Sequence, residues 1–335
     1  MKYTLLGNTG MRISKLGFGG IPIQNLSLDD AQEVIEKSLE VGINFFDTAR
    51  GYTVSERYLG HALKGKRDQA YLATKSPSLN RDGMLADVEK SLRDLQTDFI
   101  DLYQLHNVAS VGDLWRALRG DGSLKALLQL KDEGTIGHIG VTTHKEEVLK
   151  AALDEDIFET FQFPFNTVES QGEKALEEAV KRGTGTIAMK PLAGGALDNA
   201  FDSLRYALEA PFISVVIPGM DSIGQVEENA RAVDIGPLTS QEREKLMAMA
   251  KELGNHFCRR CGYCLPCPEG IQIPSMFTLE GYYSRYDLKD WAMEKYLSQN
   301  KTAVDCVECG TCESRCPYEL PIIDMMKEVE KTFKA

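Results

Sequence analysis

The chain has 335 residues, which allows one large domain or two ordinary ones. Apolar residues make up 43% of it and charged residues 26%, which argues against long disorder, a collagen repeat or a coiled-coil rod. A net charge of −12 argues against nucleic acid or an anionic membrane as the main partner. The sequence shows neither an apolar run of membrane-spanning length nor a secretion signal, so we expect a cytoplasmic protein.

Short apolar runs typical of buried strands alternate with amphipathic helical runs through residues 1–235. The strand-like runs are 16–19, 43–46, 71–73, 99–105, 139–141, 160–163, 186–189 and 213–217. The helical runs are 28–41, 55–63, 84–95, 124–133, 145–153, 173–181, 202–208 and 225–233. Eight strand–helix pairs with short connections predict an α/β fold, a closed (β/α)8 TIM barrel. A doubly wound open sheet is the alternative, but the GxGxxG turn typical of it is missing.

The composition changes near residue 254. Residues 237–253 are predicted to form one more amphipathic helix. Two cysteine runs follow, separated by a helical stretch at 275–299, and a last helix is predicted at 322–331. We therefore place a domain boundary at 253/254, with the barrel at 1–253 and a small, mainly helical domain at 254–335.

All eight cysteines of the chain lie after residue 257, in two runs of CxxC steps. The first run is Cys258-x2-Cys261-x2-Cys264-x2-Cys267-Pro268. The second run is Cys306-x2-Cys309-x2-Cys312-x3-Cys316-Pro317. The second spacing is that of a bacterial-type iron–sulfur ligand run, in which the last cysteine usually serves the other cluster. The runs therefore predict two [4Fe-4S] clusters rather than disulfides, because no secretion signal accompanies them.

Crossed ligation assigns four cysteines to each cluster. The first cluster would take Cys258, Cys261, Cys264 and Cys316, and the second Cys267, Cys306, Cys309 and Cys312. A single cluster remains an alternative, since the first run is one residue short before Cys267. A four-thiolate zinc site is a further alternative, but it would leave four thiols unused. The helical insert between the runs resembles the helical ferredoxin domains of multi-subunit redox enzymes.

Polar residues stand directly after three successive strand-like runs. Asp47, Lys75 and His106 each follow such a run, and Tyr52 lies five residues beyond Asp47. The C-terminal strand ends of a β/α barrel meet at one mouth, where active sites are built. Taken alone, Asp47 or Lys75 could equally be a solvated residue at the rim, and His106 could be a structural histidine. Together they predict an active site.

Several separated motifs then occur in order. They are LGNTG at 6–10, GINFFDTARGY at 42–52, TK at 74–75, DLYQLH at 101–106, GHIGV at 137–141, PL at 191–192, IPG at 217–219 and EN at 228–229. In this order they resemble the aldo-keto reductase family over about 1–250, and the first of them resembles the β-hairpin that plugs the barrel bottom in that family. The C-terminal part resembles the subgroup that carries a ferredoxin-like 4Fe-4S module.

The resemblance implies an NAD(P)-dependent oxidoreductase that interconverts a carbonyl and an alcohol. Its catalytic tetrad would be Asp47, Tyr52, Lys75 and His106. Tyr52 would act as general acid or base, with its pKa lowered by the ammonium of Lys75, which Asp47 holds in place. His106 would donate a hydrogen bond to the carbonyl oxygen, and the hydride would come from the nicotinamide.

The resemblance also implies a dinucleotide site. The residues at its cofactor-binding positions are Asp47, Thr142, Thr143, Gln162, Met189, Pro191, Leu192, Gly219, Gln225, Glu228 and Asn229. Met189 stands where the family has an aromatic ring, and Thr143 where it has an asparagine. Gly219 and Gln225 stand where the family's NADP readers have a lysine and an arginine, so both NADH and NADPH remain open.

Hydride moves two electrons together, whereas an iron–sulfur cluster moves one. One hypothesis is therefore a working reductase whose clusters exchange electrons with a redox partner, a flavoprotein or a ferredoxin, or stabilise the chain. The alternative is an electron-transfer or redox-sensing protein whose barrel only binds nicotinamide. Arg50 and Arg81 favour an anionic substrate, although exposed loop arginines are more often only solvated.

Overall fold

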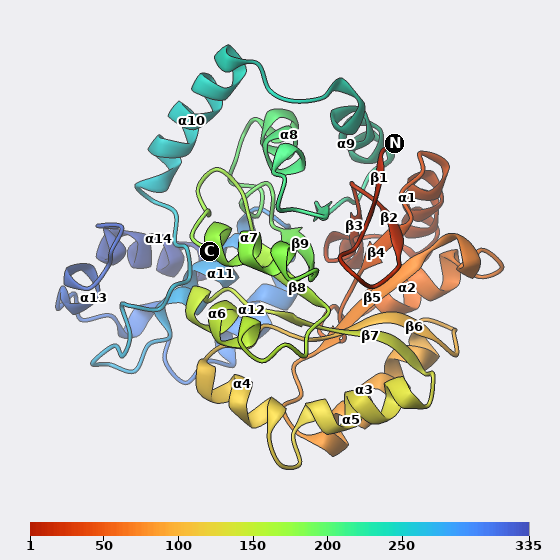
Figure 1. Cartoon of the computed structure of the whole chain (residues 1–335). Coiled ribbons are helices and arrows are strands. Elements are labelled where there is room, and N and C mark those ends of the chain that lie inside the picture. The colour runs from red at the N-terminus through yellow and green to blue at the C-terminus, as the bar shows by residue number, and fades with distance from the viewer. Residues whose placement is uncertain (335) are drawn as a thin grey trace.

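The computed structural model describes residues 1–334 and contains one sheet of eight parallel strands in sequence order (Figure 1). The strands are β3 (Phe18–Gly19), β4 (Phe45–Asp47), β5 (Tyr71–Ser76), β6 (Ile100–Leu105), β7 (Ile136–Thr142), β8 (Thr160–Pro164), β9 (Gly185–Met189) and β10 (Val215–Ile217). The two edge strands meet, because the amides of Gly17 and Gly19 donate to the carbonyls of Val216 and Pro218 at 2.8 and 2.9 Å. The predicted TIM barrel is confirmed.

Helices follow the strands around the barrel. They are α1 (Leu28–Glu40), α2 (Ser55–Ala62), α3 (Arg81–Asp94), α4 (Val111–Leu118), α5 (Ser123–Asp132), α6 (Glu146–Leu153), α7 (Glu173–Lys181), α8 (Ala200–Glu209) and α9 (Ile223–Ile235). The sequence did not predict α4. This helix is eight residues long, begins at a Ser110 N-cap and buries Leu114 and Ala117. Its length does not explain this, because α2 and α6 are equally short and were predicted; the Ser110 N-cap and the apolar face could have indicated it.

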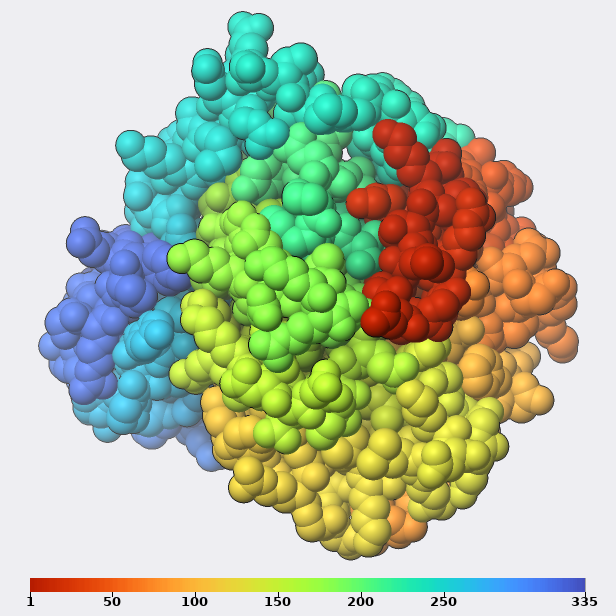
Figure 2. All heavy atoms as spheres, viewed as in Figure 1, coloured from red at the N-terminus to blue at the C-terminus, as the bar shows by residue number. Residues whose placement is uncertain are grey.

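A β-hairpin closes one end of the barrel, as predicted. Its strands β1 (Tyr3–Leu5) and β2 (Arg12–Ser14) pair antiparallel, and Figure 2 shows this segment in red over the barrel end that faces the viewer. Leu6 and Ile13 of the hairpin pack with Phe45 and Leu102 inside the barrel. Because this end is filled with apolar side chains, a site inside the barrel can open only at the other end.

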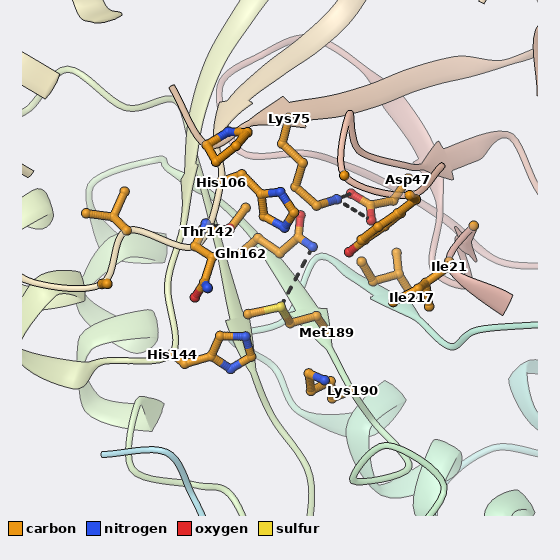
Figure 3. A pocket seen from close by; sticks show the side chains of 18 of the residues that line it. Ile21, Asp47, Lys75, His106, Thr142, His144, Gln162, Met189, Lys190 and Ile217 are labelled. Carbon is orange, nitrogen blue, oxygen red and sulfur yellow. Dashed lines mark hydrogen bonds and ion pairs between the residues drawn. The ribbon is translucent and has the colours of Figure 1, made fainter. Parts of the chain in front are cut away.

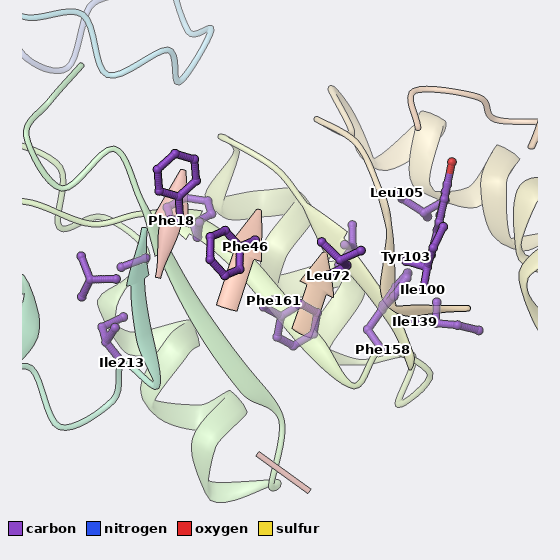
Figure 4. Close-up of a cluster of buried hydrophobic side chains, with 14 of the residues drawn as sticks. Phe18, Phe46, Leu72, Ile100, Tyr103, Leu105, Ile139, Phe158, Phe161 and Ile213 are labelled. Carbon is purple, nitrogen blue, oxygen red and sulfur yellow. The ribbon is translucent and has the colours of Figure 1, made fainter. Parts of the chain in front are cut away.

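The main core lies between the strands and their surrounding helices (Figure 4). Phe18, Phe46, Phe161 and Tyr103 are fully buried there or nearly so. Most strand residues are buried, as expected for parallel strands covered by helices. This core holds the strand ends, and therefore the polar residues that follow them, in fixed positions.

The C-terminal part of the chain is helical. Its elements are α10 (Ser240–Gly254), α11 (Ile273–Ser284), α12 (Lys289–Leu297), α13 (Thr311–Ser314) and α14 (Ile322–Lys334). The single helical stretch predicted at 275–299 is wrong in detail, because the chain turns between α11 and α12, where Asp287 adopts a left-handed φ of 53°. The part after α10, which we call the tail (255–334), has its own core, in which the rings of Tyr296 and Phe333 stack at 4.0 Å. The boundary at 253/254 stays a prediction.

The tail rests against the C-terminal ends of the barrel strands. Arg259 Nε donates to the carbonyl of Val168 at 2.9 Å, and Arg285 Nε donates to the carbonyl of Gly194 at 3.1 Å. In Figure 1, α11 and α12 accordingly lie behind the strands, whereas the hairpin is in front. None of the helices formed by residues 1–334 has the length and apolar character that a bilayer crossing demands.

Gly60 allows α2 to approach the end of α3 closely. A Cβ at this position would collide with the carbonyl oxygen of Asp94 and lie 2.6 Å from the carbonyl carbon of Leu95. We expect Gly60→Ala to lower the free energy of unfolding by about 1–3 kcal/mol, because neither backbone atom can move away cheaply. Thermal denaturation measures this. The matched control is Gly224→Ala on α9, where a Cβ would meet nothing within 4 Å; equal stability of the two variants would contradict the prediction.

Candidate active site

A cleft of about 640 Å³ opens at the C-terminal ends of the strands. Its floor comes from successive strand ends, through Asp47, Lys75, His106, Thr142, Gln162 and Met189 (Figure 3). Another wall comes from the tail, through Tyr282, Tyr286, Trp291 and Lys295. Residues from both parts of the chain therefore build one cleft.

An ion pair between Asp47 and Lys75 lies in this floor. Lys75 Nζ donates to the two carboxylate oxygens of Asp47 at 2.7 and 2.6 Å and to the carbonyl oxygen of Thr48 at 2.7 Å. Both side chains are almost completely buried. Burial raises the pKa of Asp47 and lowers that of Lys75, and their mutual attraction opposes both shifts. Three hydrogen bonds use all the donors of the ammonium, so its position is fixed.

The ring of Tyr52 lies beside this pair and beside His106. Lys75 Nζ is 5.4 Å from the centre of the Tyr52 ring. The rings of Tyr52 and His106 are 5.8 Å apart at an angle of 86°. All four members of the expected tetrad therefore line the same cleft.

The predicted lowering of the Tyr52 pKa is wrong for this arrangement. Burial of the phenol, and then the carboxylate of Asp47, raise the pKa of Tyr52 well above its usual range. Lys75 directs its ammonium at Asp47 and Thr48 instead of the phenol. Burial and the neighbouring Lys75 lower the pKa of His106 to about 3, so His106 is neutral near pH 7. The site therefore offers a protonated phenol and a neutral imidazole.

The expected cofactor positions divide into three groups. Asp47, Thr142, Gln162, Met189 and Gly219 line the catalytic cleft. A second cavity of about 240 Å³ adjoins it, sharing Gly219, Lys190 and Tyr286 with the cleft and lined also by Pro191, Leu192 and Gln225. Thr143 is buried and donates to the carbonyl of Val108 at 2.8 Å, which leaves its hydroxyl turned away from the cleft. Glu228 is exposed and Asn229 buried on α9, outside both cavities.

One amide in the floor fits a carboxamide ligand. Gln162 Nε2 donates to the sulfur of Met189, a weak acceptor 3.9 Å away, and the side chain also lies within hydrogen-bonding range of the Asp47 carboxylate, whose pKa it helps to lower. Gln162 Oε1 accepts from Gln104 at 2.8 Å, which fixes the orientation of the amide. The hydrogen that faces the weakly accepting sulfur of Met189 is thus available to an amide carbonyl in the cleft.

None of the eight cysteines, all within residues 1–334, forms a disulfide. Cys264 lies within electrostatic range of Cys312, and Tyr318 within range of both Cys261 and Cys316, so the two runs face each other. No group of three or more His, Cys, Asp or Glu side chains within residues 1–334 is arranged to hold a metal ion. A four-iron cluster spaces its thiolates more widely than a single ion does. Soft thiolates in two facing runs therefore suit iron–sulfur clusters better than zinc.

Arg260 connects the first cysteine run to the cleft. Its amide donates to Cys258 Sγ at 3.4 Å, and its Nε donates to Nδ1 of His144, a lining residue, at 3.3 Å. Its guanidinium also forms an ion pair with the buried carboxylate of Glu169. The residue itself adopts a left-handed φ of 59°. One side chain thus contacts a predicted cluster ligand and a residue of the cleft.

Sequence reasoning missed several residues of the cleft, namely His144, Lys190, Tyr282, Tyr286, Trp291 and Lys295. Lys190 directly follows β9, so the strand-end rule that indicated His106 could have found it. Arg50 does not serve the cleft as the sequence suggested, because it pairs with Glu56 and, at 2.8 Å, with Asp94. Arg81 likewise contacts Asp82 and Gln129.

Comparison with known proteins agrees with this geometry. Residues 15–203 match the model of the Aldo/keto reductase family, and residues 257–321 match that of the 4Fe-4S dicluster domain. The chain therefore belongs to the aldo/keto reductase family of oxidoreductases and carries a 4Fe-4S domain, as predicted.

Relatives and solved structures give the same result. The chain is 27% identical over 305 residues to the uncharacterized oxidoreductase YqkF of Bacillus subtilis. The aligned region covers 75% of this chain and 97% of that protein. It is 28% identical to L-galactose dehydrogenase of Arabidopsis thaliana, over 68% of this chain and 86% of that one. The structure of aldo-keto reductase AKR11C1 from Bacillus halodurans matches with a TM-score of 0.67 and 27% identity, over 74% and 96% of the two chains. An aldo-keto reductase from Klebsiella pneumoniae in complex with NADPH shares the fold, with a TM-score of 0.65 and 24% identity over 75% and 95%.

Proposed function

We propose that this enzyme interconverts a carbonyl compound and its alcohol, using a nicotinamide dinucleotide, with Tyr52 as the proton donor in the direction of reduction. The observation that carries the proposal is the convergence of Asp47, Tyr52, Lys75 and His106 on one cleft. The bound dinucleotide supplies or accepts the hydride. The residues of the chain hold the carbonyl in position and transfer the proton.

The pKa values support a division of roles within the tetrad. The raised pKa of Tyr52 keeps the phenol protonated until an alkoxide, a far stronger base, develops in front of it. The ammonium of Lys75, 5.4 Å from the ring centre, becomes more stabilising as charge moves onto the phenol oxygen. Neutral His106 donates a hydrogen bond to the same carbonyl oxygen without competing for the proton.

The two adjoining cavities suit an extended dinucleotide. The nicotinamide would lie in the catalytic cleft, with its carboxamide accepting from Gln162, and the adenosine half in the second cavity near Gln225. Lys190 lines both cavities and would meet the diphosphate between them. Since Gly219 and Gln225 lack charge, NADH and NADPH are both candidates.

Lys190 predicts how dinucleotide affinity changes with pH. Burial, and then Arg260, lower the pKa of Lys190 to about 7. The titratable and charged groups near it are Arg260, Arg285, Glu169, His144, Tyr282 and Tyr286. Below that pKa the ammonium is charged and attracts the diphosphate, whereas above it the attraction is lost. We expect the affinity for NADH to fall roughly tenfold between about pH 6 and about pH 9.

The measurement is the equilibrium quenching of NADH fluorescence across this pH range. Lys190→Met should bind more weakly at the acidic end and show a flat profile. Lys174→Met, an exposed residue of α7, is the control and should keep the full pH dependence. A wild-type profile without any fall would exclude Lys190 as a diphosphate contact.

We further propose that the tail holds two clusters, by crossed ligation, and that they are coupled to the cleft through Arg260. This residue touches Cys258 on one side and His144 on the other, which favours coupling over a purely structural role. A protein that merely binds nicotinamide would not require the complete tetrad, which disfavours an electron-transfer protein without catalysis.

The test of the proposed function is anaerobic turnover. Purified protein with its iron and sulfide measured is mixed with NADH or NADPH and a panel of aldehydes and ketones. Oxidation of the nucleotide with equal formation of alcohol is the expected result. If none of the carbonyls is reduced and none of the corresponding alcohols is oxidised, the proposal is refuted.

A further inference from the structure

A third cavity, which we call the side chamber, adjoins the catalytic cleft. It measures about 450 Å³ and shares Asn107, Ala109, His144, Tyr282, Trp291 and Lys295 with the cleft. It extends from the tetrad side toward the first cysteine run, where Arg260 and Leu265 line it. A molecule that reacts at Tyr52 can therefore extend into the side chamber.

The walls of the side chamber carry positive charge. Lys145, Arg260 and Lys295 line it, and no aspartate or glutamate of the described chain is among its lining residues. The charge of Arg260 is compensated by Glu169. Lys145 and Lys295 form no ion pair within 4 Å with any group of residues 1–334. Within residues 1–334 the ammonium of Lys295 thus has no carboxylate partner, whereas that of Lys145 also faces the thiols of the first cysteine run, in a protein whose net charge is −12.

Local structure sets the position of Lys145, whereas Lys295 is an exposed residue of α12. Lys145 directly precedes α6, and its amide donates to the hydroxyl of Thr143 at 3.0 Å. The side chain is half-buried, and Cys261, Cys264 and Cys258 of the first cysteine run lie within electrostatic range of its ammonium. Lys295 stands on α12 four residues after Trp291, so the ammonium and the indole share one helix face. An anion in the chamber would lie beside both Lys145 and Lys295, which line it.

We propose that the substrate of this enzyme is anionic, with its carbonyl at Tyr52 and His106 and a carboxylate or phosphate group in the side chamber between Lys145 and Lys295. The inference rests on the proposed carbonyl chemistry and adds the class of substrate. The aromatic faces of Trp291 and Tyr282 then cover the apolar part of the molecule between its two ends. Concave walls with one sign of charge concentrate ligands of the other sign.

The first experiment compares straight-chain aldehydes of increasing length, each as the ω-carboxylate, the ω-phosphate and the neutral methyl ester. We expect kcat/KM to be roughly ten- to a hundredfold higher for one of the anions than for the ester of the same length. Lys145→Met and Lys295→Met should remove this difference by raising KM for the anion, with the ester of the same length measured in each variant as the reference. Carboxylate and phosphate series distinguish the two anions from each other.

Matched controls lie on the same two helices. Lys150 of α6 and Lys289 of α12 are exposed and paired with Glu146 and Asp287. Lys150→Met and Lys289→Met should therefore keep the preference for anions. Because Lys145 lies near Cys261, the iron content of each variant is measured as well. The inference would be overturned if kcat/KM were as high for the esters as for the anions. It would also be overturned if the preference for anions survived in both Lys145→Met and Lys295→Met.

A binding measurement separates this inference from the proposed function. The chain has two tryptophans, Trp115 and Trp291, so Trp115→Phe leaves the chamber residue as the sole indole. Its fluorescence should respond to succinate or inorganic phosphate, and Lys295→Met should abolish the response. Anion binding without turnover of any carbonyl would refute the tetrad proposal alone. No response to either anion would overturn the anionic substrate.

Discussion

Replacing Tyr52 by phenylalanine is expected to lower kcat for carbonyl reduction roughly a hundred- to ten-thousandfold, the usual contribution of a general acid. The variant keeps the ring that contacts His106 and lies near Lys75, and loses only the proton that the alkoxide must receive. NADH binding, measured by fluorescence quenching, should stay unchanged, because no part of the diphosphate contact depends on the phenol.

The pH dependence supplies an independent check. Since the pKa of Tyr52 is raised, its protonated form persists through alkaline pH, and kcat for reduction should not fall within the range where free tyrosine loses its proton. Tyr58→Phe is the control, because the Tyr58 hydroxyl donates to the carbonyl of Leu26, away from the cleft. Undiminished kcat in Tyr52→Phe would mean that another group, or water, delivers the proton.

The barrel and the four residues of the tetrad could be predicted because both follow from short patterns of neighbouring residues in the sequence. Strand-like and helical runs alternate, and Asp47, Lys75 and His106 stand directly at strand ends, where a barrel brings them together. The direction of the Lys75 ammonium could not be predicted, because it is decided by the carbonyl of Thr48 and by the burial of the pair. That is why the expected effect on the Tyr52 pKa had the wrong sign.

The docking of the tail was beyond the reach of sequence patterns. Arg260 and Glu169 are 91 positions apart, and their pairing depends on how two separately folded cores come together. Trp291 and Tyr282 lie in helical runs, where aromatic residues are normally assigned to a core. Only the three-dimensional arrangement turns them into walls of a catalytic cleft. Under the proposal of an anionic substrate, its recognition depends on the docked tail together with Lys145 of the barrel part.

Replacing Cys316 by alanine is expected to remove the first cluster, although Cys316 belongs to the second run. Tyr318 lies within electrostatic range of both Cys261 and Cys316, and Glu269, two residues after Cys267, lies within range of Cys309. Each run thus approaches the other with its last cysteine, as crossed ligation requires. The iron content should fall by about half, from roughly eight to roughly four atoms per chain.

Double variants decide between crossed and uncrossed ligation. If Cys316 and Cys258 serve one cluster, Cys258→Ala combined with Cys316→Ala loses no more iron than either change alone. Cys306→Ala combined with Cys316→Ala then removes both clusters and nearly all iron. Uncrossed ligation reverses the two results, because Cys316 would share its cluster with Cys306. Since Arg260 touches Cys258, the crossed outcome would also mean that loss of Cys316 disturbs the cluster next to the cleft, with weaker anion binding as a measurable consequence.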